Sequence, residues 1–272
     1  MLQRAKVVFV VYAMLASAAA AGQNEADRTT VELSESQLSA KGLVLEMAAL
    51  LGGSDKFSVD MLVGYDTLQA DGQKIEFGER RQLILERPAH LRNVTQTSDG
   101  RQETLLFDGE SITLLETPAN VYARAEQPGD IDTSVRFFLA ELGMRLPLAV
   151  MLISQFPDEL ERRLLTIEYV EETDILGEPS HHVAGRTRDV DFQAWITTGE
   201  LPLPLRIVLT YRKAPGQPQF RANFANWNLD PAIDSHTFRF EPPPGTSEIP
   251  LARQVIGSPD DTDTPTSSGG EQ

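Results

Sequence analysis

Three Asp-Gly pairs set the pattern of the first half of this chain. Asp71-Gly72, Asp99-Gly100 and Asp108-Gly109 each separate stretches in which apolar and polar residues alternate. Such a pair is the strongest short signal of a β-hairpin, because the turn needs a positive φ that glycine adopts without steric cost. No helical pattern interrupts residues 57–125. The succession predicts an antiparallel meander and argues against a parallel nucleotide-binding fold, whose glycine-rich phosphate motifs the sequence lacks.

Helices are expected before and between the strands. Ser34 and Gln37 have the spacing of a capping box, and the pattern that follows predicts a helix over 35–51. Residues 131–165 are expected to be a helical insertion, in which the apolar run 146–153 forms a buried helix, with a lid or docking surface as the alternative. Strands are expected at 57–66, 74–86, 90–97, 102–107 and 111–125, and again at 166–176, 180–197, 203–213, 218–229 and 236–240.

The N-terminus has the three parts of a secretory signal peptide. Arg4 and Lys6 precede a short apolar run, and small residues up to Ala21 provide a cleavage site. The alternative, an N-terminal membrane anchor, needs about 20 apolar residues. We expect export to a bacterial periplasm, with no membrane span left after cleavage. The expected organisation is a signal peptide over 1–21, a flexible leader over 22–33, a single domain over 34–251 that contains the insertion 131–165, and a disordered acidic tail over 252–272.

Charge and composition exclude several classes of protein. The formal net charge of −16 becomes −18 when Arg4 and Lys6 leave with the signal peptide, so no basic surface is available to neutralise nucleic-acid phosphates. The absence of cysteine excludes disulfides, thiolate catalysis, iron–sulfur clusters and lipid attachment through a cysteine. We therefore expect no nucleic-acid partner and no cofactor.

No motif in the sequence points to a reaction. His181 and His182 are neighbours in a predicted strand, so they point to opposite faces and cannot share one metal ion. Neither a zinc-protease motif nor a serine-hydrolase motif occurs. The remaining enzymatic alternative is an envelope hydrolase that uses acidic side chains, with Asp189 and Asp191 as candidates. The expectation is a protein without catalytic residues and without a metal.

The distribution of apolar residues favours a binding protein. Leu203, Leu205 and Ile207 alternate with polar neighbours, so the strand has two distinct faces. An exported, half-open sheet crossed by an apolar helical insertion suits an apolar ligand. The same side chains would also fill an ordinary core, and both readings stay open at this point. A scaffold protein that docks an envelope partner through the apolar helix 146–153 is a further alternative.

Short motifs resemble the bacterial outer-membrane lipoprotein carrier and receptor superfamily. Arg87-Pro88 looks like a strand end of that superfamily, Asp108-Gly109 looks like its hairpin, and Phe-Arg-Phe-Glu-Pro-Pro-Pro-Gly at 238–245 is similar to its closing segment. A closer resemblance, over about 34–251, is to an uncharacterised family of predicted periplasmic proteins, domain of unknown function 2092. It rests on Tyr122-Ala123, 191–196, 203–206 and 220–227.

The resemblance implies a mainly β (α+β) fold, an open, incomplete antiparallel β-barrel whose mouth is covered by helices. In the carriers such a cavity shelters acyl chains. The implied function is therefore a periplasmic, non-enzymatic binding protein for an acyl chain, a lipid or another apolar ligand, with a lipid, an acylated protein or an envelope protein as partner. We expect a monomer. Neither Arg87, Arg92 nor Arg206 can be matched to the arginine that holds the lid of the carriers. The side chains expected to line the cavity are Phe57, Met61, Leu83, Leu85, Phe107, Phe138, Leu142, Leu148, Leu152, Trp195, Ile207, Leu209, Phe220 and Phe224.

Overall fold

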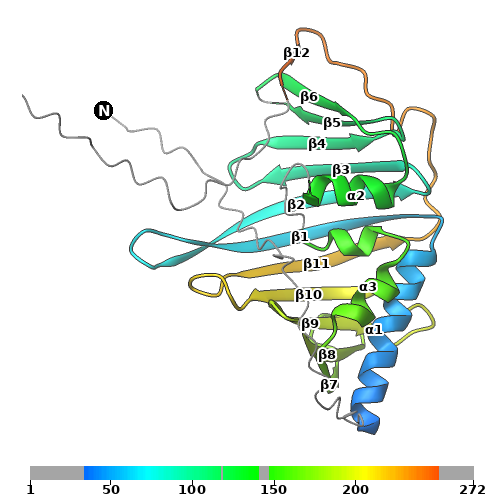
Figure 1. Ribbon diagram of the computed structural model, residues 1–272, viewed down its shortest axis with the longest axis vertical. Coiled ribbons are helices and arrows are strands. Elements are labelled where there is room, and N and C mark those ends of the chain that lie inside the picture. The colour runs from blue at the N-terminus through cyan, green and yellow to red at the C-terminus, as the bar shows by residue number, and fades with distance from the viewer. Residues whose placement is uncertain (1–33, 118, 141–146, 251–272) are drawn as a thin grey trace, which may run out of the picture.

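A single open sheet dominates the computed structural model, which describes residues 34–117, 119–140 and 147–250. Its twelve strands follow the order β12-β6-β5-β4-β3-β2-β1-β11-β10-β9-β8-β7 (Figure 1). All neighbours are antiparallel except the short β12, which runs parallel to β6. The sheet does not close, since β12 and β7 remain its two edges. The predicted fold, an open and incomplete antiparallel barrel, is confirmed.

The strands alternate with short turns in two groups. The first group is β1 Lys56–Leu68, β2 Lys74–Glu86, β3 His90–Thr97, β4 Gln102–Phe107, β5 Ser111–Glu116 and β6 Val121–Glu126. The second is β7 Thr166–Thr173, β8 Ser180–Arg186, β9 Val190–Thr197, β10 Pro204–Tyr211 and β11 Gln219–Asn228, with β12 Ser247–Glu248 at the end. Strand β1 joins the groups, because it pairs with β2 on one side and with β11 on the other.

The Asp-Gly turns have the expected geometry. Gly72, Gly100 and Gly109 have φ values of 87°, 85° and 87°, a region that other residues enter only at a steric cost. Two predicted runs are each divided by a turn that was not expected, so 111–125 forms β5 and β6, and 180–197 forms β8 and β9. The strand expected at 236–240 is wrong, because residues 236–238 lie in a turn and residues 239–240 have no regular secondary structure.

Four helical elements accompany the sheet: α1 Glu35–Gly53, α2 Ile131–Ala140, the 3₁₀ turn η1 Ala149–Leu152 and α3 Phe156–Arg163. The capping box of Ser34 and Gln37 is present at the start of α1, as predicted. The apolar run 146–153 is not an α-helix: within its described residues only η1 is helical. Leu148, with φ 70° and ψ 4°, takes the left-handed conformation directly before η1 and so prevents a regular helix. None of the helices that the structure describes has both the length and the apolar character needed to cross a bilayer.

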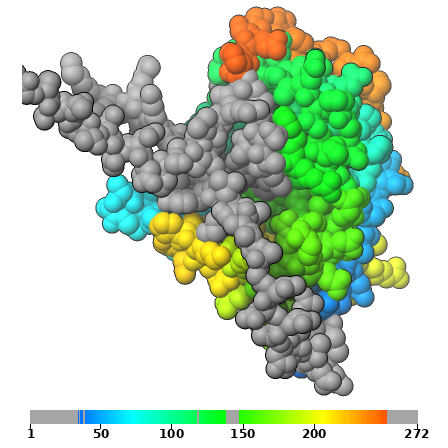
Figure 2. Space-filling model, viewed as in Figure 1, coloured from blue at the N-terminus to red at the C-terminus, as the bar shows by residue number. Residues whose placement is uncertain are grey.

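The helices cover one face of the sheet, which we call the inner face (Figure 1). Helix α1 contacts β7, β9, η1 and α3, while the insertion that contains α2, η1 and α3 lies over the middle of the sheet (Figure 2). The opposite, outer face is partly covered by the segment 229–250. There the ring of Phe238 stacks on the ring of His90 of β3, with centroids 5.0 Å apart. The ring of Phe240 packs against the ring of Tyr122 of β6, with centroids 4.9 Å apart.

Candidate functional site

The inner face changes from apolar to charged along strands β2 to β5. The register places Leu85, Leu91, Phe107 and Ile112 in one row across these strands. All four side chains are buried, and together they form the part of the core nearest to the helices. This end of the inner face is entirely apolar in these four strands.

A polar row lies four residues further along the same strands. It consists of Arg81, Thr95, Glu103 and Glu116, which are paired across β2, β3, β4 and β5. Because side chains alternate between the faces of a strand, these residues share the inner face with the apolar row. The inner face of β2 to β5 is thus amphipathic along its length.

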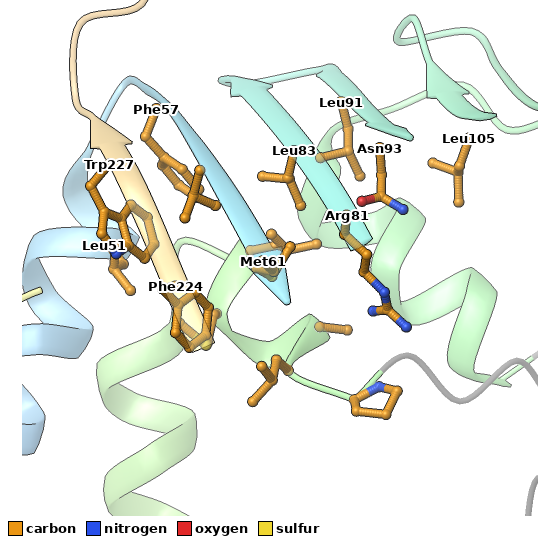
Figure 3. A pocket seen from close by; sticks show the side chains of 16 residues that line it. Leu51, Phe57, Met61, Arg81, Leu83, Leu91, Asn93, Leu105, Phe224 and Trp227 are labelled. Atoms are coloured by element: carbon orange, nitrogen blue, oxygen red, sulfur yellow. The ribbon is translucent and has the colours of Figure 1, made fainter. Parts of the chain in front are cut away.

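An apolar cavity of about 70 Å³ lies between the two rows, under the segment 147–152 that includes η1. Strands β1 to β4 and β11 form its floor. Figure 3 shows Leu51, Trp227 and Phe224 towards one end and Arg81 and Asn93 towards the other. The lining consists of Leu51, Phe57, Val59, Met61, Arg81, Leu83, Leu91, Asn93, Leu105, Pro147, Leu148, Ala149, Met151, Leu152, Phe224 and Trp227.

The cavity continues towards α2. A second space of about 10 Å³ shares Leu91, Leu105 and Leu152 with the first and is closed by Ile131 and Val135 of α2. Since one water needs about 10–15 Å³ of such volume, the larger cavity has room for about five waters. Most of the inner face is therefore a filled core, with a small hollow under the segment 147–152.

Apart from Trp195, the structure places the predicted lining residues in four groups. Phe57, Met61, Leu83, Leu148, Leu152 and Phe224 line the larger cavity, and Phe107 lines the smaller one. Leu85, Ile207, Phe220 and Leu209 belong to the surrounding core, the first three as buried members and Leu209 packed against it. Leu142 and the side chain of Phe138 lie outside the described residues.

Trp195 lies on the outer face, so its predicted place in the cavity is corrected. Its neighbours Ala194 and Ile196 in β9 are buried in the core, and alternation turns Trp195 to the other side. There its ring stacks on His182, with centroids 4.1 Å apart, and lies 5.7 Å from the guanidinium of Arg206. An amphipathic ring suits this partly exposed surface as well as it would suit a cavity, which explains the error.

Arg81 and Asn93 are lining residues that the sequence analysis missed. The Nε atom of Arg81 donates to Oε1 of Glu79 at 2.6 Å, and its guanidinium lies 5.8 Å from the ring of Phe220. The Glu79 side chain is buried, so this ion pair is largely removed from water. The alternation of β2, in which Glu79 and Arg81 share parity with Leu83, would have placed both residues on the inner face.

Asn93 brings a polar atom into the apolar lining. Its Nδ2 donates to Oγ1 of Thr95 at 3.0 Å. Its Oδ1 is inaccessible to solvent and accepts no hydrogen bond from any residue that the structure describes. Buried acceptors in proteins normally have a partner, because an unsatisfied acceptor costs about 1–3 kcal/mol.

Glu103, a member of the polar row, has a pKa above its usual value. Desolvation raises the pKa of Glu103, and the negative charges of Glu116 and Glu79 raise it further. The Glu103 side chain still reaches solvent, since this end of the inner face is open. On β1, which pairs with β2, desolvation and the negative charge of Glu79 also raise the pKa of Tyr65.

Arg87 ties the helices to the rim of the sheet. Its Nε and Nη2 donate to the carbonyl oxygens of Ser54 and Leu51 at the end of α1, at 3.1 and 3.3 Å. Its Nη1 lies 3.8 Å from Asp132 of α2, whose Oδ1 accepts the backbone N–H of Ser154 at 2.8 Å. Burial lowers the pKa of Arg87. Arg87 thus connects α1, α2 and the segment after η1. The sequence analysis did not predict this role.

The acidic residues considered for hydrolysis are engaged in ion pairs. Asp191 contacts Arg186 at 2.7 Å and Arg212 at 2.9 Å, while Asp189 contacts Lys213. Within the described ranges, no group of three His, Asp or Glu side chains is arranged to hold a metal ion.

A sequence profile for a family described as "Predicted periplasmic protein (DUF2092)" matches residues 40–252. The chain belongs to this family. Its members are described as periplasmic, in agreement with the export predicted from the N-terminus, and the resemblance to the family is confirmed. The signal peptide itself lies outside the described residues.

Several solved structures are similar to this DUF2092 protein at low identity. MucB of Pseudomonas aeruginosa in its complex with MucA is 16% identical, with a TM-score of 0.41, over 75% of this chain and 61% of that chain. The chain therefore spans about three fifths of the MucB chain that it matches. The lipoprotein LppX of Mycobacterium tuberculosis is 12% identical, with a TM-score of 0.44, over 73% and 100% of the two chains. A LolA superfamily protein of Nitrosomonas europaea is 10% identical, with a TM-score of 0.35, over 74% and 97%. The search of curated proteins gave no match.

Proposed function

We propose that this protein is a periplasmic, non-enzymatic binding protein that holds an acyl chain, a lipid or another apolar ligand on the inner face of its sheet. The observation that carries the proposal is the cavity under the segment 147–152, whose lining is apolar except for Arg81 and Asn93. Concave, mostly apolar pockets with a few polar groups are typical of small-molecule sites. Each methylene group that leaves water for such a site contributes about 0.8 kcal/mol.

The segment 147–152 must move for a long chain to enter, because the present cavity holds only a few carbon atoms. This segment contains one turn of 3₁₀ helix, and the left-handed conformation of Leu148 costs about 1–2 kcal/mol. Asp132 and Ser154 hold the chain just beyond it to α2. A short, strained segment whose C-terminal end is held to α2 is suited to yield to a ligand while the sheet stays unchanged.

The scaffold alternative has less support in the structure. Docking through the run 146–153 would need its apolar side chains at the surface. Ala149, Met151 and Ile153 are instead buried, with 4%, 5% and 7% of their surface accessible. The apolar side of this segment faces the cavity and the core, as expected for a cover rather than a docking surface.

Protein purified from its own cell envelope under mild conditions tests the proposal directly. Native mass spectrometry and solvent extraction should recover a bound lipid or acylated molecule. The purified and delipidated protein should then bind the apolar fluorescent probe N-phenyl-1-naphthylamine. Protein that is reproducibly empty and also fails to bind the probe would contradict the proposal.

A matched pair of variants on β1 locates the site. Met61→Trp places a larger ring in the cavity and should weaken probe binding by about tenfold, or ~1.4 kcal/mol. Leu62→Trp makes the same addition at the next residue, which points to the outer face and is 56% exposed, and should leave probe binding unchanged. Equal effects of the two changes in fluorescence titrations would place the bound probe elsewhere.

A further inference from the structure

On the basis of the proposed function, the bound ligand also has a head group, and the inner face limits the chemistry of that group. A ligand whose chain lies under 147–152 and points towards Leu51 and Trp227 has its other end at Arg81 and Asn93. Beyond Arg81 the register continues into Thr95, Glu103 and Glu116. The polar row is therefore the part of the inner face that a head group would meet.

The polar row has more negative than positive charge. Arg81 is its only cation, and both Nε and Nη2 of that guanidinium already donate to Glu79. Glu103 and Glu116 lie opposite each other on β4 and β5, and no described basic residue forms an ion pair with either of them. Each residue repels the negative charge of the other, which is one cause of the raised pKa of Glu103. An anionic head group placed here would add a third like charge.

The hydrogen-bonding groups at this end are mainly acceptors. Carboxylates accept hydrogen bonds and donate none when ionised. The Oδ1 atom of Asn93 is an acceptor in the cavity lining, is closed off from solvent and has no partner among the described residues. A donor on a bound ligand would satisfy this atom and would also be favourable next to Glu103.

We infer that the site selects an amphiphile whose head group donates hydrogen bonds and carries no negative charge, such as a hydroxylated head group. The chain of this amphiphile lies in the apolar cavity, and its hydroxyl groups meet Asn93, Glu103 and Glu116. Free fatty acids and anionic phospholipids are disfavoured, because their charge approaches two carboxylates that form no ion pair with a described basic residue. Arg81 and Arg101 act on Glu103 from a distance, and both are already paired, with Glu79 and Asp99.

Two probes with the same acyl chain test the inference. 1-Lauroylglycerol and laurate are titrated at pH 7.5 against delipidated protein loaded with N-phenyl-1-naphthylamine. The native protein should bind the glycerol ester at least about tenfold more tightly than laurate. Because the two probes also differ in solubility, the informative quantity is the change of this ratio in a variant.

The variant Glu103→Gln with Glu116→Gln removes both negative charges and keeps the side-chain size. It should bind N-phenyl-1-naphthylamine normally and reduce the preference for the glycerol ester at least threefold. The control, Glu110→Gln with Glu200→Gln, makes the same change in net charge at two exposed turns and should keep the native ratio. A native ratio near one, or an equal ratio in all three proteins, would overturn the inference and leave the proposed function standing. Failure of every probe to bind would overturn both.

Discussion

The pKa of Glu103 in the polar row depends on burial and on the charged side chains around it. Glu103 and Glu116 face each other across β4 and β5, and Glu79 lies nearby on the same face. The pKa of Glu103 is raised from 4.5, first by desolvation and then by these two charges. The folded protein therefore holds the Glu103 proton more tightly than the unfolded chain does.

This difference makes a pH-dependent contribution to stability. The contribution of Glu103 decreases as the pH rises from 4.5 through its raised folded pKa, because the folded state must then give up a proton that it favours. Glu103→Gln should therefore raise the free energy of unfolding at pH 7, by less than about 1 kcal/mol because the side chain reaches solvent. The gain should vanish below pH 4.5. Urea unfolding of both proteins from pH 4 to 8 measures it, and a gain that grows towards low pH would refute the assignment.

The contact between helix α1 and the chain after η1 depends on a glycine. Gly52 and Gly53 look alike in the sequence, where both signal the end of a helix. In the structure a Cβ atom on Gly52 would lie 2.7 Å from the carbonyl oxygen of Ser154, whereas nothing lies within 4 Å of one on Gly53. Gly52 is therefore needed for close packing of α1 against the segment that leads into α3.

The two glycines form a natural pair of variants. Gly52→Ala should destabilise the protein by about 1–3 kcal/mol, because the clash is with backbone and cannot be relieved by a rotamer change. Gly53→Ala should be neutral or stabilising by up to about 1 kcal/mol, owing to the higher helix propensity of alanine. Hydrogen exchange of residues 149–163 should accelerate only in Gly52→Ala. Similar behaviour of the two variants would show that the close approach is unimportant.

The strands were largely predictable, because period-two alternation and Asp-Gly turns are local signals. The missed turn between β5 and β6 contains Asn120, with φ 53°, but the apolar residues on both sides obscured it. The turn between β8 and β9, at residues 187–189, contains neither Gly nor Pro. The cavity was only partly predictable, since its polar members Arg81 and Asn93 lie on a face expected to be apolar. The left-handed Leu148 depends on packing between distant segments, which no local pattern reveals.

Across the described residues, the protein is a sheet with a separate cover on each face. Helices cover the inner face, and the segment 229–250 crosses the outer face of the β3 to β6 half. The aromatic residues of that segment attach it, since Phe238 stacks on His90 and is only 7% exposed. Asn120 adds a hydrogen bond from Nδ2 to the carbonyl oxygen of Gly245 at 2.6 Å.

Removal of the main aromatic anchor should therefore affect global stability. Phe238→Ala should lower the free energy of unfolding by about 3–5 kcal/mol, as expected for a buried phenylalanine. Ile249→Ala, at a residue of the same segment that is 44% exposed, should cost much less. Equilibrium unfolding monitored by circular dichroism compares the two. A small loss for Phe238→Ala would mean that the outer cover contributes little to the fold.

The pairing of β1 with β11 also governs the order in which this chain can fold. Strands β1 to β6 can form successive hairpins as they enter the periplasm, but the free edge of β1 has no partner until residues 219–228 have arrived. Contacts so distant in sequence form slowly, and unpaired edges bind other chains. Until that pairing forms, the central strand of the sheet is an exposed edge, and we expect proteases and holding chaperones to compete for it with β11.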